Sequence, residues 1–593
     1  MAYDVFMCGI FGYVGDNGSA AKLVLTGIKS LEYRGYDSWG VAAVAKGKMF
    51  IKKRVGKIGD NNVSDSPNSN IAIGHTRWAT HGGVTNINAH PHLDCTSSIA
   101  IIHNGIFENY ELFKKRLIGK GHEFVSETDT ETLAHLIEEF KKSNSFSESV
   151  RKTFNQMDGL NAIIVIDKNE NKIIAARNGS PLIIGFGNNE NFLASDASAL
   201  LPFTKEVYFL EDEEMAVLQK NKVEVFNVRT GKKINFRQYK LNWKTTQAEK
   251  GKYPNFMLKE IYEQPHMILG IASNPSLEVR IANIVKKAKG TYLVGCGTAS
   301  YACLAGQYLF SRIAKCHVNS AIGSEFGYHL EFLNKDSLII AVSQSGETMD
   351  ILESIKKAKD AGAKIACLTN SFGSSLYRMS DYKILIGAGP EKAVASTKAF
   401  TGMLAHLILL AYTLKGQAGE GQKVLVQSVK SIKKVLSQKN LNNVRKLAKI
   451  LGNRKHIYVI GRGLSYPTAL ETALKIKEIS YIHAEGLAAG ELKHGPLALV
   501  EKGTPCIAYL PKDETYGANL AGAMEMHARG GLIIGVSYKP HEVFDYFIKI
   551  DDAKEATIIS NVVFAQLLAY FLTIRRGFDP DKPRNLAKSV TVR

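Results

Sequence analysis

Cys8 stands almost at the start of the chain and opens the apolar run Cys8–Gly12. A thiolate is a strong nucleophile, and a cysteine that is also the first residue carries its own base, because an α-amine has a pKa of about 8. That pairing suits hydrolysis of an amide at neutral pH. Residues 1–7 precede Cys8 in the sequence. We therefore expect them to be absent from the active chain, most simply through translation from Met7 and loss of that methionine.

Four further segments of the first half carry groups that could bind or activate a polar substrate. Taken singly, each has an ordinary structural explanation. Arg77 and Asp129 could form an ion pair, Asn104 and Gly105 a turn, and the histidines buried hydrogen-bonded imidazoles. The segments are Gly74–Gly82, Asn88–His92, His103–Ile106 and Ser126–Thr130. The spacing of His90 and His92 could suggest a metal, but no third ligand accompanies them, so we expect none.

Two patterns in the second half could also do chemistry. The apolar strand 338–342 runs into Ser343–Thr348, and a hydroxyl-rich turn at a helix N-terminus is a natural seat for a phosphate, although the same residues are good helix caps. Glu471, Lys475 and Glu478 recur at i, i+4 and i+7 on one helix face. Spacing alone favours a solvated ladder of ion pairs for them.

The elements that must position these groups differ between the two halves. Up to about residue 240, short β-branched runs separated by turns, such as 162–166 and 172–176, predict hairpins and an α+β fold with antiparallel sheets. We expect helices near 20–33 and over 130–141. The sequence becomes polar and aperiodic between about 238 and 252, which is typical of a linker.

The second half alternates apolar strands with long helical segments, which predicts parallel α/β layers. It also repeats itself: strand-glycine turns at 292–297 and 457–463 are each followed by a strand after about 43 residues and by another after about 27 more. Two doubly wound subdomains are expected. The predicted domains are residues 8–238, a linker at 239–256, subdomains at 257–425 and 440–575, and a tail at 576–593.

Composition narrows the class of protein. With 593 residues and 45% hydrophobic composition the chain can bury several cores. Seven scattered cysteines fit neither a disulfide framework nor a short zinc motif. A formal net charge of +19 comes without a nucleic-acid motif, so anionic substrates are favoured over nucleic acid. The apolar stretches 403–414 and 562–574 are expected to be buried helices too short to cross a membrane, and we expect a cytoplasmic protein.

Together, the motifs of the first half resemble the glutaminase domain of class II glutamine amidotransferases, which are N-terminal nucleophile hydrolases with αββα layers. The resemblance makes Cys8 the nucleophile that attacks the glutamine amide, and Asn104 and Gly105 the donors to the oxyanion. It assigns the substrate α-carboxylate to Arg77 and the α-ammonium to Asp129. It also places Trp78, Thr80, His81 and His90 around the glutamine, with Trp78 gating the passage of ammonia.

The second half resembles a pair of SIS (sugar isomerase) domains. The resemblance makes Glu478 the base that moves a proton between sugar C1 and C2, with Lys475 beside it, His494 the ring opener and Lys588 the Schiff-base amine. One departure is the sequence Gly297–Tyr301, where Ala299 stands in place of a hydroxyl and Ser300 could substitute. The implied sugar-phosphate pocket consists of Thr298, Ser343, Gln344, Ser345, Thr348, Val394, Ser396 and Ala587.

The combination, with Arg34–Ser38 and His75–Gly82, is similar to the family of glutamine:fructose-6-phosphate aminotransferases. This implies glutamine and fructose 6-phosphate as substrates, transfer of ammonia inside the protein, and an amino-sugar product that leads to UDP-N-acetylglucosamine. It implies a homodimer and no cofactor. Two alternatives stay open: a sugar-phosphate isomerase or regulatory binding protein with a silent glutaminase domain, if residues 1–7 are retained, and a class II amidotransferase with another acceptor.

Overall fold

The computed structural model describes residues 8–241 and 249–588. The expected loss of residues 1–7 therefore concerns residues outside the described part. The described residues divide into two compact units, one up to residue 249 and the other from Lys250 to Lys588. Each unit is described by itself.

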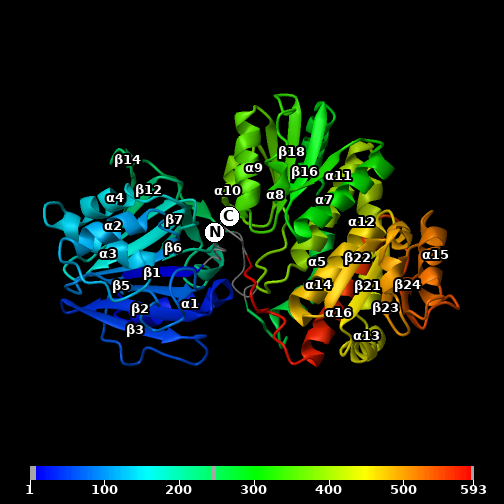
Figure 1. Ribbon diagram of the computed structural model, residues 1–593. Helices are drawn as coiled ribbons and strands as arrows, with labels where there is room; N and C mark the ends of the chain where they lie inside the picture. The colour runs from blue at the N-terminus through cyan, green and yellow to red at the C-terminus, as the bar shows by residue number, and fades with distance from the viewer. Residues whose placement is uncertain (1–7, 242–248, 589–593) are drawn as a thin grey trace. The chain divides into compact units, whose positions relative to one another are not determined.

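The first unit contains two antiparallel sheets (Figure 1). One has the strand order β15-β11-β9-β10-β1-β4-β2-β3 and the other β14-β13-β12-β8-β7-β6-β5. The strands of the first sheet are β1 (Gly9–Gly15), β2 (Ser38–Ala45), β3 (Lys48–Val55), β4 (Ile71–Arg77), β9 (Ile183–Phe186), β10 (Glu190–Ala194), β11 (Glu206–Phe209) and β15 (Tyr239–Lys240). Those of the second are β5 (His92–Leu93), β6 (Ile99–Gly105), β7 (Asn161–Asp167), β8 (Ile173–Asn178), β12 (Glu214–Gln219), β13 (Lys222–Asn227) and β14 (Lys233–Ile234).

Strand periodicity explains the layers of this unit. Alternate residues of β6 point to opposite faces, so Ala100 and Ile102 join the core between the sheets, whereas Ile99 and Ile101 join a second core under the helices. Both faces of this sheet are therefore covered. The helices are α1 (Ala20–Ser30), η1 (Glu32–Arg34), α2 (Tyr110–Ile118), α3 (Asp129–Lys141), α4 (Phe146–Phe154) and η2 (Ala197–Ala199). With α1 on the first sheet and α3 on the second, the unit has the αββα layers of N-terminal nucleophile hydrolases.

Local expectations for this unit were met with small shifts. The hairpin expected at 162–176 is β7 paired antiparallel with β8, and the helix expected at 130–141 is α3. The helix expected at 20–33 ends at Ser30 and continues as the 3-10 turn η1. The segment 239–256, predicted as linker, starts with β15, whose Tyr239 and Lys240 pair with β11.

The second unit contains two five-stranded parallel sheets of matching order, β17-β16-β18-β19-β20 and β22-β21-β23-β24-β25. The strands of the first sheet are β16 (Gly290–Gly295), β17 (Asn319–Ile322), β18 (Ser337–Ser343), β19 (Lys364–Thr369) and β20 (Tyr382–Leu385). Those of the second are β21 (His456–Gly461), β22 (His483–Ala488), β23 (Pro505–Leu510), β24 (Leu532–Ser537) and β25 (Tyr546–Lys549). The predicted repeat of two doubly wound subdomains is confirmed.

One large hydrophobic core joins the two subdomains and includes the central helices α11 and α16. The predicted boundary at 425 falls inside α12, and the one at 440 falls inside α13. The helices are α5 (Phe256–Ser273), α6 (Ser276–Val285), α7 (Thr298–Leu309), the π-turn η4 (Phe310–Ala314), α8 (Gly323–Phe326), α9 (Met349–Asp360), α10 (Ser375–Met379), α11 (Lys398–Leu414), α12 (Ala418–Val435), α13 (Gln438–Leu451), α14 (Ser465–Ser480), η5 (Ala489–His494), η6 (Pro496–Leu499), α15 (Tyr516–His527) and α16 (Thr557–Arg575).

The apolar stretch 562–574 lies in α16. Together with the residues before it, Lys554–Arg575 is long and apolar enough to cross a membrane, with a mean hydropathy of 1.8. The helix is thus longer than the stretch considered in the sequence, but the expectation of a buried helix is confirmed. Of the apolar window, 89% is buried inside the unit, as in the core helix of a globular domain.

Candidate active sites

Cys8 immediately precedes β1 and is buried, with 8% of its surface exposed. Its Sγ accepts a hydrogen bond from the backbone N–H of Trp78 at 3.2 Å. Burial outweighs this hydrogen bond and raises the pKa of the thiol to about 11. The thiol is therefore protonated at neutral pH, and it needs an adjacent base before it can act as a nucleophile.

Asn104 and Gly105 end β6 beside Cys8. The Asn104 Nδ2 donates to the Cys8 carbonyl oxygen at 2.9 Å, while the Asn104 Oδ1 lies 3.2 Å from Nε2 of His75. The same Nε2 lies 3.0 Å from the His103 carbonyl oxygen. Because both neighbours of His75 Nε2 are oxygen atoms, this nitrogen carries a proton and donates it. The contact therefore orients the Asn104 amide with Oδ1 toward His75 and Nδ2 toward Cys8.

Gly105 adopts a φ of +125°. A Cβ at this position would lie 2.1 Å from the Leu160 carbonyl oxygen, so only glycine fits. This conformation turns the chain out of β6 at the point where the sequence predicted a donor to the oxyanion.

Arg77 and Asp129 are both engaged with backbone groups. The Arg77 guanidinium donates to the carbonyl oxygens of residues 81–83, including Gly83 at 3.2 Å. The first residue of α3, Asp129, accepts the backbone N–H of Phe107 at 2.8 Å. These bonds use three of the five N–H donors of the guanidinium, so a substrate carboxylate would share Arg77 with the loop 81–83 or displace it.

Most residues predicted for glutamine binding line one cavity of about 20 Å³. A space of this size holds about one water molecule. Glutamine is larger than this space, so the residues that line the cavity must move apart for it to bind. The cavity is lined by Cys8, Arg77, Trp78, Thr80, His81, His90, His103, Gly105, Thr128, Asp129 and Thr130.

Buried histidines surround this cavity. The ring of His75 stacks on that of His90 with centroids 4.2 Å apart, and His92 packs edge-on against His90 at 4.7 Å. Burial lowers the pKa of His75 to about 3 and the pKa values of His90 and His92 well below their usual range. These imidazoles are therefore neutral at physiological pH.

We expect the first unit to lose stability in mild acid. In the unfolded chain these three imidazoles take up protons near pH 6.5, whereas in the folded unit they do not, so stability is fully present above that pH and is lost as the pH falls through it. From pH 7 to 5.5 the loss is about 4 kcal/mol for three imidazoles.

Tryptophan fluorescence in urea would measure this loss. Trp39 and Trp78 lie in the first unit, and the sequence from 250 to 588 contains no tryptophan. His90→Asn should reduce the pH dependence by about one third. A free energy of unfolding that stays constant from pH 7 to 5.5 would contradict the expectation.

In the second unit, Lys475 of α14 brings three predicted residues together. Its Nζ donates to Thr298 Oγ1 at 3.1 Å and to Glu478 Oε2 at 2.5 Å. Its other neighbour is Glu471 Oε1 at 3.4 Å. The Lys475 and Glu471 side chains are fully buried, whereas that of Glu478 is 21% exposed. Of the two carboxylates beside Lys475, only that of Glu478 is therefore accessible to a ligand.

The two carboxylates beside Lys475 differ in environment. Burial raises the pKa of Glu471 to about 8, against the opposing effect of Lys475, whereas the pKa of Lys475 is raised because both carboxylates favour its ammonium form over the cost of burial. The solvated ladder that the spacing alone favoured is therefore wrong, since Lys475 and Glu471 lie in the interior.

The turn Ser343–Thr348 joins β18 to α9, as predicted. Ser343 Oγ accepts the N–H of Gly346 at 3.0 Å and lies 3.4 Å from Thr348 Oγ1. Ser345 Oγ accepts the N–H of Glu347 at 3.1 Å. Because β16 and β18 are adjacent and parallel, this turn and the one that carries Thr298 lie at the same edge of the sheet, where α/β domains bind ligands.

Lys588 is held by a buried carboxylate that sequence reasoning missed. Its Nζ donates to Glu391 Oε2 at 2.6 Å and to the Ala393 carbonyl oxygen at 2.8 Å. Glu391 also accepts from Ser396 Oγ at 3.3 Å. Burial would raise the pKa of Glu391, but Lys588 lowers it overall. The structure thus brings Lys588 and Ser396 together through Glu391.

The other predicted sugar-site residues are placed as follows. Val394 donates its N–H to the Asp581 carbonyl oxygen at 3.0 Å, and the Gln344 carbonyl oxygen accepts from Asn370 at 3.1 Å. Ser300 Oγ donates to the Gly297 carbonyl oxygen at 2.7 Å, so its hydroxyl proton is used within the first turn of its own helix. His494 ends η5 and is exposed, and Ala587 is half-buried.

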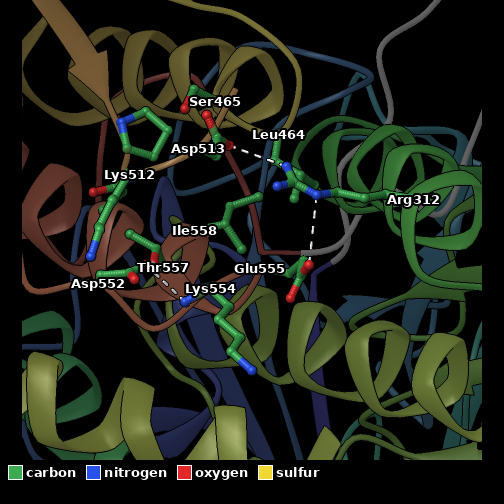
Figure 2. A pocket seen from close by; sticks show the side chains of 12 residues that line it. Arg312, Leu464, Ser465, Lys512, Asp513, Asp552, Lys554, Glu555, Thr557 and Ile558 are labelled. Atoms are coloured by element: carbon green, nitrogen blue, oxygen red, sulfur yellow. Dashed lines mark hydrogen bonds and ion pairs between the residues drawn. The ribbon is translucent and has the colours of Figure 1, made fainter. Parts of the chain in front are cut away.

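A second cavity, of about 130 Å³, lies at the corresponding edge of the second sheet (Figure 2). Asp513, which follows β23, accepts from Arg312 of η4 at 3.2 Å, and Glu555 lies 3.6 Å from the same guanidinium. None of the predicted sugar-site residues lines it. Arg312, Lys512 and Lys554 line it together with Asp513, Asp552 and Glu555, and the Arg312 guanidinium is paired with two of these carboxylates.

Residues missed by the sequence analysis are the partners of predicted residues, namely His75, Glu391 and Glu471. His75 lies in a segment that had been singled out, and Glu471 had been noticed as part of a ladder. Glu391 had no signal, since a lone glutamate in a loop reveals neither its burial nor the lysine it meets about 200 residues further on.

Known proteins match both units. Residues 75–202 match the glutamine amidotransferase domain family, and residues 284–412 and 450–572 match the SIS domain family. The first unit is therefore a glutamine amidotransferase domain, and the second is a pair of SIS domains.

Similarity also extends over nearly the whole chain. Proteins named glutamine–fructose-6-phosphate aminotransferase [isomerizing] from Thermococcus kodakarensis and Pyrococcus horikoshii are 44% and 42% identical, over 99% of this chain and 100% of theirs. The solved C-terminal domain of glucosamine-fructose-6-phosphate aminotransferase from Francisella tularensis is 34% identical and covers 56% of this chain and 100% of its own, with a TM-score of 0.53. The chain belongs to the family of glutamine–fructose-6-phosphate aminotransferases [isomerizing].

Proposed function

We propose that this chain makes glucosamine 6-phosphate and glutamate from fructose 6-phosphate and glutamine. The main support is that one chain of this family carries both a buried Cys8 facing a small polar cavity and a Thr298–Lys475–Glu478 cluster beside a hydroxyl-rich turn. The first arrangement suits amide hydrolysis, and the second suits proton transfer on a sugar phosphate.

In the proposed first half-reaction, Cys8 Sγ attacks the side-chain amide carbon of glutamine. The Cys8 α-amine takes the thiol proton and passes it to the leaving ammonia, and water then hydrolyses the thioester to glutamate. The Asn104 Nδ2 and the Gly105 N–H stabilise the oxyanion, where one donor contributes about 3 kcal/mol. The raised pKa of the Cys8 thiol supports the need for that amine.

In the proposed second half-reaction, the Ser343–Thr348 turn and Thr298 bind the phosphate, and His494 opens the sugar ring. Lys588 leaves Glu391 and forms an imine with the C2 carbonyl, which releases water. Ammonia then displaces the lysine at C2. Glu478 removes a proton from C1 and returns one to C2, while the C1 hydroxyl loses its proton and the imine nitrogen gains one, so that C1 becomes the aldehyde and C2 carries the amine. Passage of ammonia inside the protein would keep it from being protonated in water.

The decisive experiment measures glutamate and glucosamine 6-phosphate from glutamine plus fructose 6-phosphate, together with the intact mass of the purified protein. We expect both products in equal amounts from chains that begin at Cys8. A chain that keeps residues 1–7 and interconverts sugar phosphates without releasing glutamate would establish the silent-domain alternative. Glutamate release without an amino sugar would indicate another acceptor.

We also propose that the protein acts as a cytoplasmic homodimer in amino-sugar synthesis, supplying the precursor of UDP-N-acetylglucosamine. The exposure of His494, away from any described contact with Lys475, supports a role for it in the site of a partner subunit. The mass of the assembly in solution checks the homodimer.

We expect His75 to position Asn104. His75→Ala removes the donor that faces Asn104 Oδ1, so the amide no longer holds the orientation required for the oxyanion, and kcat for glutamine hydrolysis should fall about 10- to 100-fold. KM should change less. His75→Gln, which keeps an N–H donor, should restore part of kcat. An equal loss in both variants would indicate a merely structural role.

A further inference from the structure

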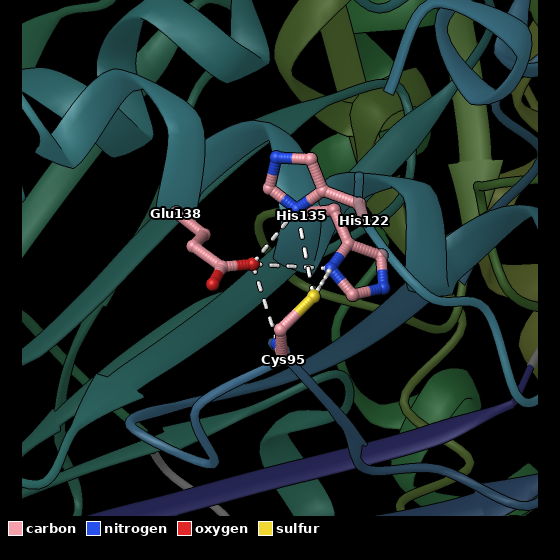
Figure 3. Close-up of side chains that lie close together, drawn as sticks. All are labelled: Cys95, His122, His135 and Glu138. Carbon is pink, nitrogen blue, oxygen red and sulfur yellow. Dashed lines mark hydrogen bonds and ion pairs between the residues drawn. The ribbon is translucent and has the colours of Figure 1, made fainter. Parts of the chain in front are cut away.

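Four side chains that belong to neither proposed site converge in the first unit. They are Cys95, His122, His135 and Glu138 (Figure 3). Cys95 lies in the loop 94–98 between β5 and β6, His122 lies between α2 and α3, and His135 and Glu138 lie one turn apart on α3. One ligand atom from each residue lies within 4.8 Å of all the others.

The distances between these atoms resemble the edges of a tetrahedral metal site. Cys95 Sγ lies 3.6 Å from His122 Nδ1 and 3.5 Å from His135 Nδ1. Glu138 Oε2 lies 3.0 Å and 3.2 Å from the same two nitrogens. In a tetrahedral zinc site, with the usual bond lengths, sulfur and nitrogen are about 3.6 Å apart and nitrogen and oxygen about 3.4 Å.

Each imidazole has a carboxylate on its outer side. His122 Nε2 lies 3.2 Å from Glu139 Oε2, and His135 Nε2 lies 3.8 Å from Glu131 Oε1. At His122 the carboxylate is within hydrogen-bond distance, so it favours the proton on Nε2 and leaves the Nδ1 lone pair for a metal, as is usual for metal-bound histidines. At His135 the carboxylate is beyond that distance, and Nε2 has no hydrogen-bond partner among the described residues.

With the protons of both imidazoles on Nε2, the four facing side-chain atoms include two bare ring nitrogens and a carboxylate oxygen. Among the described residues, the only backbone donor to that oxygen is the Cys95 N–H at 3.3 Å. Two Nδ1 lone pairs, the Cys95 sulfur and a Glu138 oxygen would face one another with no hydrogen between the nitrogens and the carboxylate. Such an arrangement calls for a cation, either as a metal or as a second proton on each imidazole. The thiol favours the metal, because sulfur with imidazole nitrogen is a ligand set typical of zinc.

We propose that Cys95, His122, His135 and Glu138 bind one zinc ion per chain. Because all four ligands come from the protein, the site is structural and leaves no position for a substrate. It ties the loop before β6, which carries Asn104, to α3, which begins at Asp129. The exposure of Cys95 provides the route by which the ion enters.

The test uses the full chain without a histidine tag, after removal of metals with EDTA, and in a Cys8→Ser background so that the nucleophile cannot contribute a thiolate. Titration with Co²⁺ should give the charge-transfer band of a cobalt thiolate and the strong visible bands of tetrahedral geometry, with saturation at one ion per chain. Zn²⁺ should displace the cobalt. Zn²⁺ should also raise the temperature at which the tryptophan fluorescence of the first unit changes.

Cys95→Ser should abolish the thiolate band and weaken zinc binding more than about 100-fold, and Glu139→Gln should weaken it about 10-fold. Cys316→Ser, which removes a free cysteine of the other unit, should change neither. Far-UV circular dichroism checks that the Cys95 variant is folded. No saturable binding in the parent chain, or binding that Cys95→Ser and His135→Asn both leave unchanged, would overturn the proposal. These outcomes do not depend on the proposed enzymatic activity.

Discussion

Cys8→Ala should abolish the synthesis of amino sugar from glutamine, with a fall of at least about 10⁴-fold, the loss typical when a covalent nucleophile is removed. The variant should still make the amino sugar when ammonium salts replace glutamine. The reason is that Cys8 is placed to release ammonia, whereas the residues around Lys475 are placed to use it. Measuring glucosamine 6-phosphate with each nitrogen source checks the prediction.

The matched control is Cys316→Ala, a free cysteine outside both proposed sites. It should keep both activities. Loss of the ammonia-dependent reaction in Cys8→Ala would mean that the thiol has a structural role. Undiminished use of glutamine would show that Cys8 is not the nucleophile and would remove the basis of the first half-reaction.

Glu478→Gln should have the opposite pattern. Loss of the proposed base should lower amino-sugar formation by about 10² to 10⁴-fold with either glutamine or ammonia. Glutamate release should persist, because the amide-hydrolysing residues lie in the other unit. A parallel assay of glutamate and glucosamine 6-phosphate measures both effects in one sample.

A comparison with Glu471→Gln locates the base. Burial raises the pKa of Glu471 to about 8, so this carboxyl is largely neutral at pH 7 and glutamine resembles its working form. We expect less than about a 10-fold loss for this variant. Glu501→Gln, at an exposed position, serves as the control. A larger loss for Glu471→Gln than for Glu478→Gln would reassign the base.

Much of the fold could be predicted because its signals are local. Strand-glycine turns repeated at a fixed spacing predicted the two parallel sheets. β-branched runs joined by turns predicted the antiparallel hairpin of β7 and β8. Helix ends were less predictable. The pattern near residue 33 is apolar enough for a helix, but the chain changes there to a 3-10 turn.

Candidate site residues could be recognised in the sequence only where several reactive side chains lie in one short segment. Cys8, Arg77 and Asp129 line one cavity as the resemblance implied. The partners that tune them come from distant segments, and no short-range pattern reveals such pairings. Lys588 with Glu391 is one example, and the four side chains around Cys95 are another, since only His135 and Glu138 have a recognisable spacing.

The edge of the second sheet has a consequence for how many sugar phosphates one chain can hold. When a chain contains two copies of one domain, function requires only one of them to bind the ligand, and the binding residues of the other copy can change. At this edge the second subdomain has Asp513 after β23, where the first subdomain has the hydroxyl-rich turn Ser343–Thr348 after β18. Arg312 of the first subdomain donates to Asp513 at 3.2 Å and lies 3.6 Å from Glu555. We therefore expect one sugar phosphate to bind per polypeptide. At the corresponding edge of the second subdomain, the ion pairs of Arg312 instead join the two subdomains.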